Sequence, residues 1–117
     1  MGKPNLAAGR FDVASVNGAL TLVITSQMDD QFEVAEYLSR GVYRITLRSD
    51  RDVRAANDVF YTATSLGLHV GPTQGLGDIV ECLGGFANGR AQVIVKIFGS
   101  AGDAVDSAFY LFAAIKD

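Results

Sequence analysis

The sequence predicts an all-β protein, an antiparallel, jelly-roll-like β-sandwich of about eight strands. Two Asn-Gly pairs lie between segments of alternating apolar residues, which is typical of tight hairpins because both turn residues tolerate a positive φ. No segment shows a sustained 3.6-residue apolar period bounded by helix caps. The chain has 117 residues, of which 49% are hydrophobic, and this suffices to bury the core of one domain.

The first hairpin is predicted around Asn17-Gly18. The turn pairs the residues on its two sides as Val16–Ala19, Val13–Leu22 and Phe11–Ile24. The Val13–Leu22 and Phe11–Ile24 pairs form one apolar face, while Arg10 and Asp12 fall on the other. We therefore expect a core face and a polar face on this hairpin.

A later hairpin is predicted around Asn88-Gly89, and both of its faces are largely apolar. One face pairs Cys82–Val95 and Val80–Ile97, and the other pairs Glu81–Lys96, Leu83–Ile94 and Ile79–Phe98. A strand of a two-layer sandwich needs only one apolar face. The second face should be covered either by another element of the chain or by another subunit, and we favour a subunit interface.

The stretch SRGVYRITLRSDRD, residues 39–52, is interpreted as a strand that follows a turn at Arg40-Gly41. The predicted pairs are Leu38–Tyr43 and Val34–Leu47 on the core face, with Glu36 beside Ile45, and Tyr37–Arg44 and Glu33–Arg48 on the reverse face. Five of the seven arginines lie within residues 40–54. They form either a positive patch for an acidic protein or anionic glycan, or a face balanced by Glu33, Asp50, Asp52 and Asp58.

Further strands are predicted in DVFYTATS, in LGLHVG and in the closing SAFYLFAAI. GPTQGLGD, residues 71–78, is expected to be a Gly-rich loop. No linker or internal repeat divides the chain, so we expect an N-terminal arm over residues 1–10 and a single β-sandwich domain over residues 11–117.

Residues suited to catalysis or metal binding are scarce. His69 is the only histidine and has no nucleophile motif beside it, and the lone Cys82 lies among apolar residues. The paired aspartates match no calcium-loop pattern and are interpreted as turn residues. With a net charge of −3 and no apolar run of membrane-spanning length, we expect no enzyme, cofactor, metal, nucleic-acid or membrane partner.

The strands SRGVYRITL, AANDVFYTATS and AQVIVKIFGSAGDAVDSAFYLFAAI resemble a small β-module of virion proteins of tailed bacteriophages. The matching features are Gly41, Tyr43, Ile45 and Leu47 in one strand, Asn57-Asp58 before the next, and an Asp-rich turn over residues 103–106. Such modules occur in tail fibres, receptor-binding tips and capsid decoration proteins, usually as trimers. The resemblance implies a structural, oligomeric role and no catalytic residues.

The resulting hypothesis is a non-enzymatic virion protein, a homotrimeric capsid decoration or cement protein that binds the major capsid protein or another virion protein on the capsid surface. The expected subunit-interface residues are Ile79, Leu83, Ile94, Phe98, Phe109, Tyr110 and Phe112. The expected capsid or partner contacts are Lys3, Pro4, Asn5, Leu6, Arg10, Arg51 and Arg54. One alternative is a tail-fibre or tail-tip subunit that binds a host receptor, and another is a C1q-like or lectin-like ligand-binding module.

Overall fold

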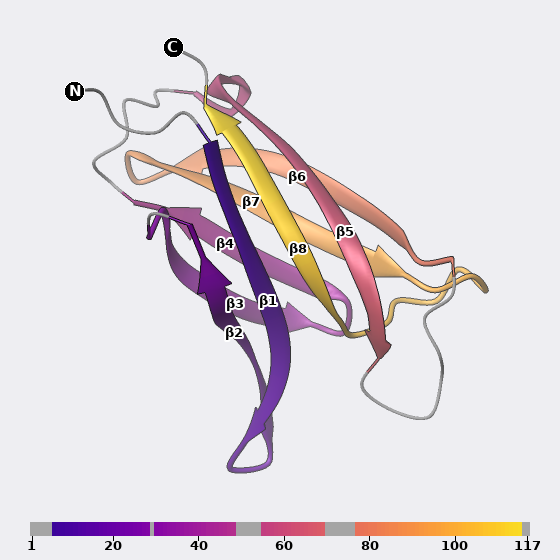
Figure 1. Ribbon diagram of the computed structural model, residues 1–117. Coiled ribbons are helices and arrows are strands. Elements are labelled where there is room, and N and C mark those ends of the chain that lie inside the picture. Colours follow the sequence, from indigo (N-terminus) through magenta and orange to yellow (C-terminus); the bar gives the residue numbers. More distant parts are fainter. Residues whose placement is uncertain (1–5, 29, 49–54, 70–76, 116–117) are drawn as a thin grey trace.

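The computed structural model describes residues 6–28, 30–48, 55–69 and 77–115. In this part of the chain, eight strands form two four-stranded antiparallel sheets that pack face to face, as Figure 1 shows. A single 3-10 turn, η1 (Ala56–Asp58), precedes the fifth strand. The all-β sandwich that the sequence predicts is confirmed.

The strands of sheet A, in spatial order, are β2 (Ala19–Gln27), β1 (Leu6–Val16), β8 (Ser107–Ile115) and β5 (Val59–His69). Those of sheet B are β3 (Phe32–Ser39), β4 (Val42–Leu47), β7 (Arg90–Phe98) and β6 (Ile79–Ala87). The hairpins β1–β2, β3–β4 and β6–β7 each lie within one sheet, and the other connections join the two sheets. Because β1 begins at Leu6 and pairs with β8, the arm predicted for residues 1–10 is wrong for residues 6–10.

The two Asn-Gly hairpins have the predicted registers. Asn17 and Gly18 have φ angles of 52° and 80°, and Asn88 and Gly89 have 56° and 74°, as a type I′ turn requires. Every cross-strand pair predicted for the two hairpins is present. The first hairpin contains one further feature, a register shift between Arg10 and Phe11.

The β3–β4 hairpin has a different register from the predicted one. The turn pairs Ser39 with Val42 as expected, but a bulge between Tyr37 and Ser39 displaces the next four pairs by one residue, and a second shift between Phe32 and Val34 pairs Phe32 with Leu47. Tyr37 therefore pairs with Tyr43, where Leu38 was expected, and Leu38 is exposed. A one-residue shift exchanges the two faces of a strand, which is why the predicted Tyr37–Arg44 contact does not form.

The segments DVFYTATS and LGLHVG form one strand rather than two. β5 runs from Val59 to His69, with a register shift against β8 between Ser65 and His69 and a positive φ of 70° at Gly67. The bulge lets a long strand bend without ending.

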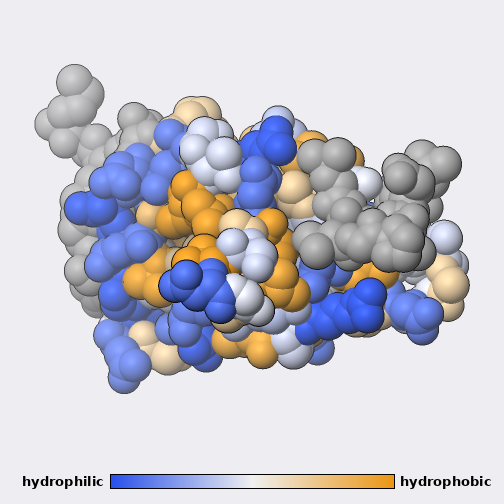
Figure 2. Space-filling model, turned by 90° about the horizontal axis from the view of Figure 1, so that it is seen from below, coloured by the Kyte–Doolittle hydropathy of each residue, from blue (hydrophilic) through white to orange (hydrophobic). Residues whose placement is uncertain are grey.

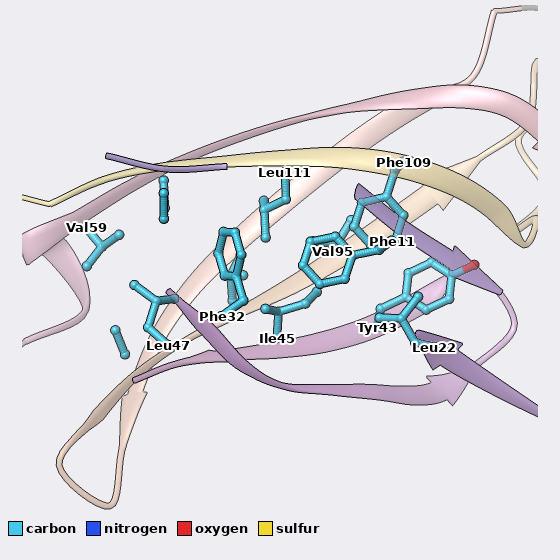
Figure 3. Close-up of a cluster of buried hydrophobic side chains, with 14 of the residues drawn as sticks. Phe11, Leu22, Phe32, Tyr43, Ile45, Leu47, Val59, Val95, Phe109 and Leu111 are labelled. Carbon is cyan, nitrogen blue, oxygen red and sulfur yellow. The ribbon is translucent and has the colours of Figure 1, made fainter. Parts of the chain in front are cut away.

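The core lies between the sheets and is rich in aromatic side chains, several of which Figure 3 labels. Phe109 stacks on Phe11 and on Tyr43, with ring centroids 5.2 Å apart in each case, and Phe32 meets Phe11 edge to face at 5.4 Å. Full burial of each such ring stabilises the fold by about 1.5–3 kcal/mol. Phe109 is completely buried in the chain's own core, so its expected place in a subunit interface is wrong.

Candidate functional site: the outer faces of the two sheets

The outer face of sheet B carries an exposed apolar patch. Alternate side chains of β6 and β7 point away from the core, and Leu83 pairs with Ile94 and Ile79 with Phe98 on this side. Ile79 and Leu83 remain 62% and 45% exposed. We call these four residues the B patch. It is the second apolar face that the sequence predicts; Ile94 and Phe98 are half-buried, and the described part of the chain leaves Ile79 and Leu83 exposed.

Charged residues of opposite sign lie within the B patch and beside it. Glu81 lies opposite Lys96 between the two apolar rungs. On β4, Arg44 lies beside Ile94 and donates two hydrogen bonds to the Glu36 carboxylate, from Nε to Oε1 at 2.9 Å and from Nη2 to Oε2 at 2.8 Å. These bonds lower the pKa of Glu36 and raise the pKa of Arg44. The border of the patch is therefore close to neutral.

The outer face of sheet A carries a second apolar patch. Its members come from β1, β5, β8 and the residue after β2, and they are Leu6, Ala8, Met28, Phe60, Phe112 and Ala114, which we call the A patch. They line most of a hollow of about 360 Å³. Phe60 is 76% exposed and Phe112 is 47% exposed. The A patch as a unit was not predicted, because it joins residues from both ends and the middle of the chain.

The residues expected in the subunit interface do not share one surface. Ile79, Leu83, Ile94 and Phe98 lie on the outer face of sheet B, whereas Tyr110 and Phe112 point outward from sheet A on the other side of the sandwich. Exposed apolar side chains also occur on the β1–β2 hairpin, at Val16, Leu20 and Val23. Figure 2 views the molecule from the end where this hairpin projects and shows apolar surface bordered by hydrophilic residues.

Of the residues expected to contact a capsid, the structure describes Leu6 and Arg10. Both are in β1, with Leu6 exposed in the A patch. Arg10 Nε donates to Asp12 Oδ1 at 3.1 Å, and this bond together with the carboxylate charge raises the pKa of Arg10. Lys3, Pro4, Asn5, Arg51 and Arg54 lie outside the described residues.

Within the arginine cluster of residues 40–54, Arg44 and Arg48 form ion pairs, although not with the predicted partners. The expected Glu33–Arg48 ion pair is wrong: Arg48 Nη1 donates to Asp30 Oδ2 at 2.9 Å. Glu33 instead pairs with Arg90 at 2.7 Å, and Arg90 also donates to the carbonyl oxygen of Leu47. These pairs favour the balanced face over a free positive patch for the described arginines.

A buried carboxylate at Asp106 joins the β3–β4 turn to the start of β8. The side chain is 5% exposed. Its Oδ1 accepts hydrogen bonds from Gly41 N at 2.7 Å and Tyr43 Oη at 2.9 Å, and its Oδ2 accepts one from Tyr37 Oη at 2.8 Å. Burial and these bonds raise the pKa of Tyr37 to about 12 and raise that of Tyr43 further. The sequence predicts only a turn at Asp106, because the residues beside it give no signal of these distant partners.

Two further hollows adjoin β5. One, of about 300 Å³, is lined by Ser65 and Asp78, where Ser65 Oγ donates to Asp78 Oδ2 at 2.6 Å and accepts from Gly67 N at 3.1 Å. The other, of about 430 Å³, is lined by Tyr61 and Cys82. Burial raises the pKa of both Tyr61 and Cys82, which keeps the phenol and the thiol neutral near pH 7. The Cys82 thiol is therefore protonated, and the Ser65 hydroxyl is held between the Asp78 carboxylate and the Gly67 amide.

Among the described residues, no group of three or more His, Cys, Asp or Glu side chains is placed to hold a metal ion. No helix of the described chain has the length and apolar character to cross a membrane. Comparison with protein-family models, curated protein sequences and solved structures finds no match to this chain. The two apolar patches are therefore the features on which a function is argued.

Proposed function

We propose that this chain is a non-enzymatic structural component of a tailed-bacteriophage virion, a homotrimeric decoration protein that stabilises the capsid shell. The observation that carries the proposal is the B patch, a row of outward apolar side chains on a sheet that already has a complete core on its inner side. Large exposed apolar patches on soluble domains are typical of interaction sites. The resemblance of the strand pattern to phage virion modules supplies the biological setting.

The B patch suits a subunit contact better than a small-molecule site. It consists of two apolar rungs on adjacent strands with the Glu81–Lys96 rung between them, and beside it Arg44 and Glu36 form an ion pair within the chain. Protein interfaces combine apolar side chains with polar and charged groups in this way. A decoration protein that binds only the assembled shell stabilises that state by linkage, because binding lowers the free energy of the assembled lattice alone.

The subunit contact is tested with Leu83→Asp. Leu83 is 45% exposed, so the change should leave the fold intact while it places a charge in the B patch. We expect light scattering to show a trimer for the unmodified chain and a smaller species for the variant. Val16→Asp is the matched control, because Val16 is similarly exposed, at 53%, and lies in a different sheet. A trimer that survives Leu83→Asp would refute the assignment of the B patch.

The place in the virion is tested by counting copies in purified particles by quantitative mass spectrometry. A decoration protein should be present in hundreds of copies, because it covers the repeating lattice. A count of only a few would move the protein to the tail and overturn the capsid assignment.

Deletion of residues 2–5, which precede β1, should weaken binding to capsids and leave the melting temperature unchanged if this segment contacts the lattice.

A further inference from the structure

The A patch alternates large and small side chains in both directions across sheet A. One rung of the sheet places Ala114 between Leu6 and Phe60, and the next places Phe112 between Ala8 and Thr62. Ala8 is also next to Met28, whose backbone N–H donates to the Ala8 carbonyl at 2.9 Å. Each alanine thus leaves a depression, or hole, between bulkier neighbours. Each bulky side chain projects as a knob beside such a hole.

Two observations show how uneven this surface is: the volume of the hollow and the exposure of the side chain at its edge. The hollow has a volume of about 360 Å³. Phe60 at its edge is the most exposed of the large apolar side chains in the described part of the chain. A protruding ring and a hollow with apolar walls therefore occur on the same face, and the described residues leave the hollow unfilled.

We propose that the A patch binds the A patch of a second copy of this chain about a two-fold axis. A two-fold contact brings one surface against itself, so the knobs of each copy enter the holes of the other. None of the described residues that line the hollow is charged. On β1, Arg10 and Asp12 lie on this same face and pair with each other at 3.1 Å, so their charges balance within each copy.

The exposed area indicates how strong this contact is. A Phe side chain presents about 150–250 Å², so Phe60 and Phe112 expose roughly 180–310 Å² between them at their exposed fractions. With Leu6 and Met28, a two-fold contact buries on the order of 800 Å² in total, below the roughly 1,200 Å² of a standard stable interface. One such contact is weak. If the chain is trimeric as proposed, three contacts between two trimers act together and strengthen the association by avidity.

The experiment is sedimentation velocity over a range of concentrations with Phe60→Asp, Phe112→Asp and the control Val16→Asp. We expect the unmodified chain to form even-numbered assemblies, and both Phe variants to raise the dissociation constant of that step at least tenfold. Both phenylalanines are substantially exposed, so the variants should unfold at the same temperature as the unmodified chain. Leu83→Asp in the B patch should dissolve the proposed trimer and its avidity, and it should leave a weaker step from monomer to dimer that Phe60→Asp then abolishes in the double variant; this separates the inference from the proposed trimer.

Three outcomes overturn the inference. The first is sedimentation of the unmodified chain that is independent of concentration up to about 1 mM, where even weak complexes form. The second is an equal loss of the same step in Val16→Asp, which would place the contact on the β1–β2 hairpin. The third is a Leu83→Asp variant that stays monomeric up to about 1 mM, with no step that Phe60→Asp further weakens, which would mean that the A patch binds a B patch and builds an open stack rather than a closed pair.

Discussion

Replacing Asp106 should be the most damaging single polar substitution in the described part of the chain. Its carboxylate accepts hydrogen bonds from Gly41 N, Tyr43 Oη and Tyr37 Oη at 2.7–2.9 Å. Asp106→Ala removes both carboxylate oxygens and therefore all three hydrogen bonds at once. Asp106→Asn retains one acceptor oxygen and loses the negative charge.

The expected loss in free energy of unfolding depends on which hydrogen-bond donors lose their acceptor. The Gly41 and Tyr43 donors are buried, and a buried donor left without an acceptor costs about 1–3 kcal/mol, so the two together cost about 4 kcal/mol. Tyr37 is partly exposed, so water can replace the lost acceptor. Asp106→Asn should cost about 2 kcal/mol, because its oxygen keeps the Gly41 and Tyr43 bonds in their weaker, uncharged form.

Urea unfolding monitored by circular dichroism gives the free energy of unfolding for each variant. Asp103→Ala is the control, since Asp103 is exposed on the same turn and should change stability by less than about 0.5 kcal/mol. A loss below about 1 kcal/mol for Asp106→Ala, or equal losses for Ala and Asn, would refute the reasoning from buried donors.

Other predictions concern the turn glycines, the tyrosines and the cysteine. Gly41→Ala should lower the free energy of unfolding in urea by about 3 kcal/mol or more, because the new Cβ would lie 2.7 Å from the Ile97 carbonyl oxygen. Gly18→Ala, whose Cβ would have no neighbour within 4 Å, should lower it by about 1 kcal/mol for the positive φ alone. Above pH 10 the unfolded chain loses the Tyr37 proton while the folded chain keeps it up to about pH 12, so the melting temperature should fall across this window, and a Tyr37→Phe variant should fall less steeply. At pH 8 Cys82 should react with a thiol reagent many times more slowly in the folded chain than in urea, because burial raises its pKa; equal rates would contradict its placement.

The sequence was sufficient to predict the sandwich and the two Asn-Gly hairpins. At these turns the residue types require positive φ, and the turn length then determines every pair along the strands. In the β3–β4 hairpin the turn does not determine the register of the whole hairpin, because the bulge at Leu38 depends on contacts made far away in the chain. There Gly41 donates to Asp106 and accepts from Ile97 N at 2.9 Å, which holds the turn in place.

The candidate site could be predicted only in part. The B patch follows from the alternation within one hairpin, so local sequence was enough to find it. In β8 both sets of alternate residues are apolar, and the sequence alone did not distinguish inward Phe109 from outward Phe112. The A patch required the pairing of β1 and β5 with β8, which places Leu6 and Phe60 in the same rung although they are far apart in the chain.

The position of β8 has a consequence for how the chain folds during synthesis. β8 lies between β1 and β5 in sheet A, so Phe11 finds its partner Phe109 only after the seven preceding strands and β8 itself have been made. The three hairpins form from local contacts, but sheet A cannot join its two halves until β8 leaves the ribosome. Such long-range pairing makes folding slow, because a large loop must close before the pairing stabilises it. Until then, the open edges of β1 and β5 are exposed to other nascent chains, so fast, crowded expression should favour aggregation.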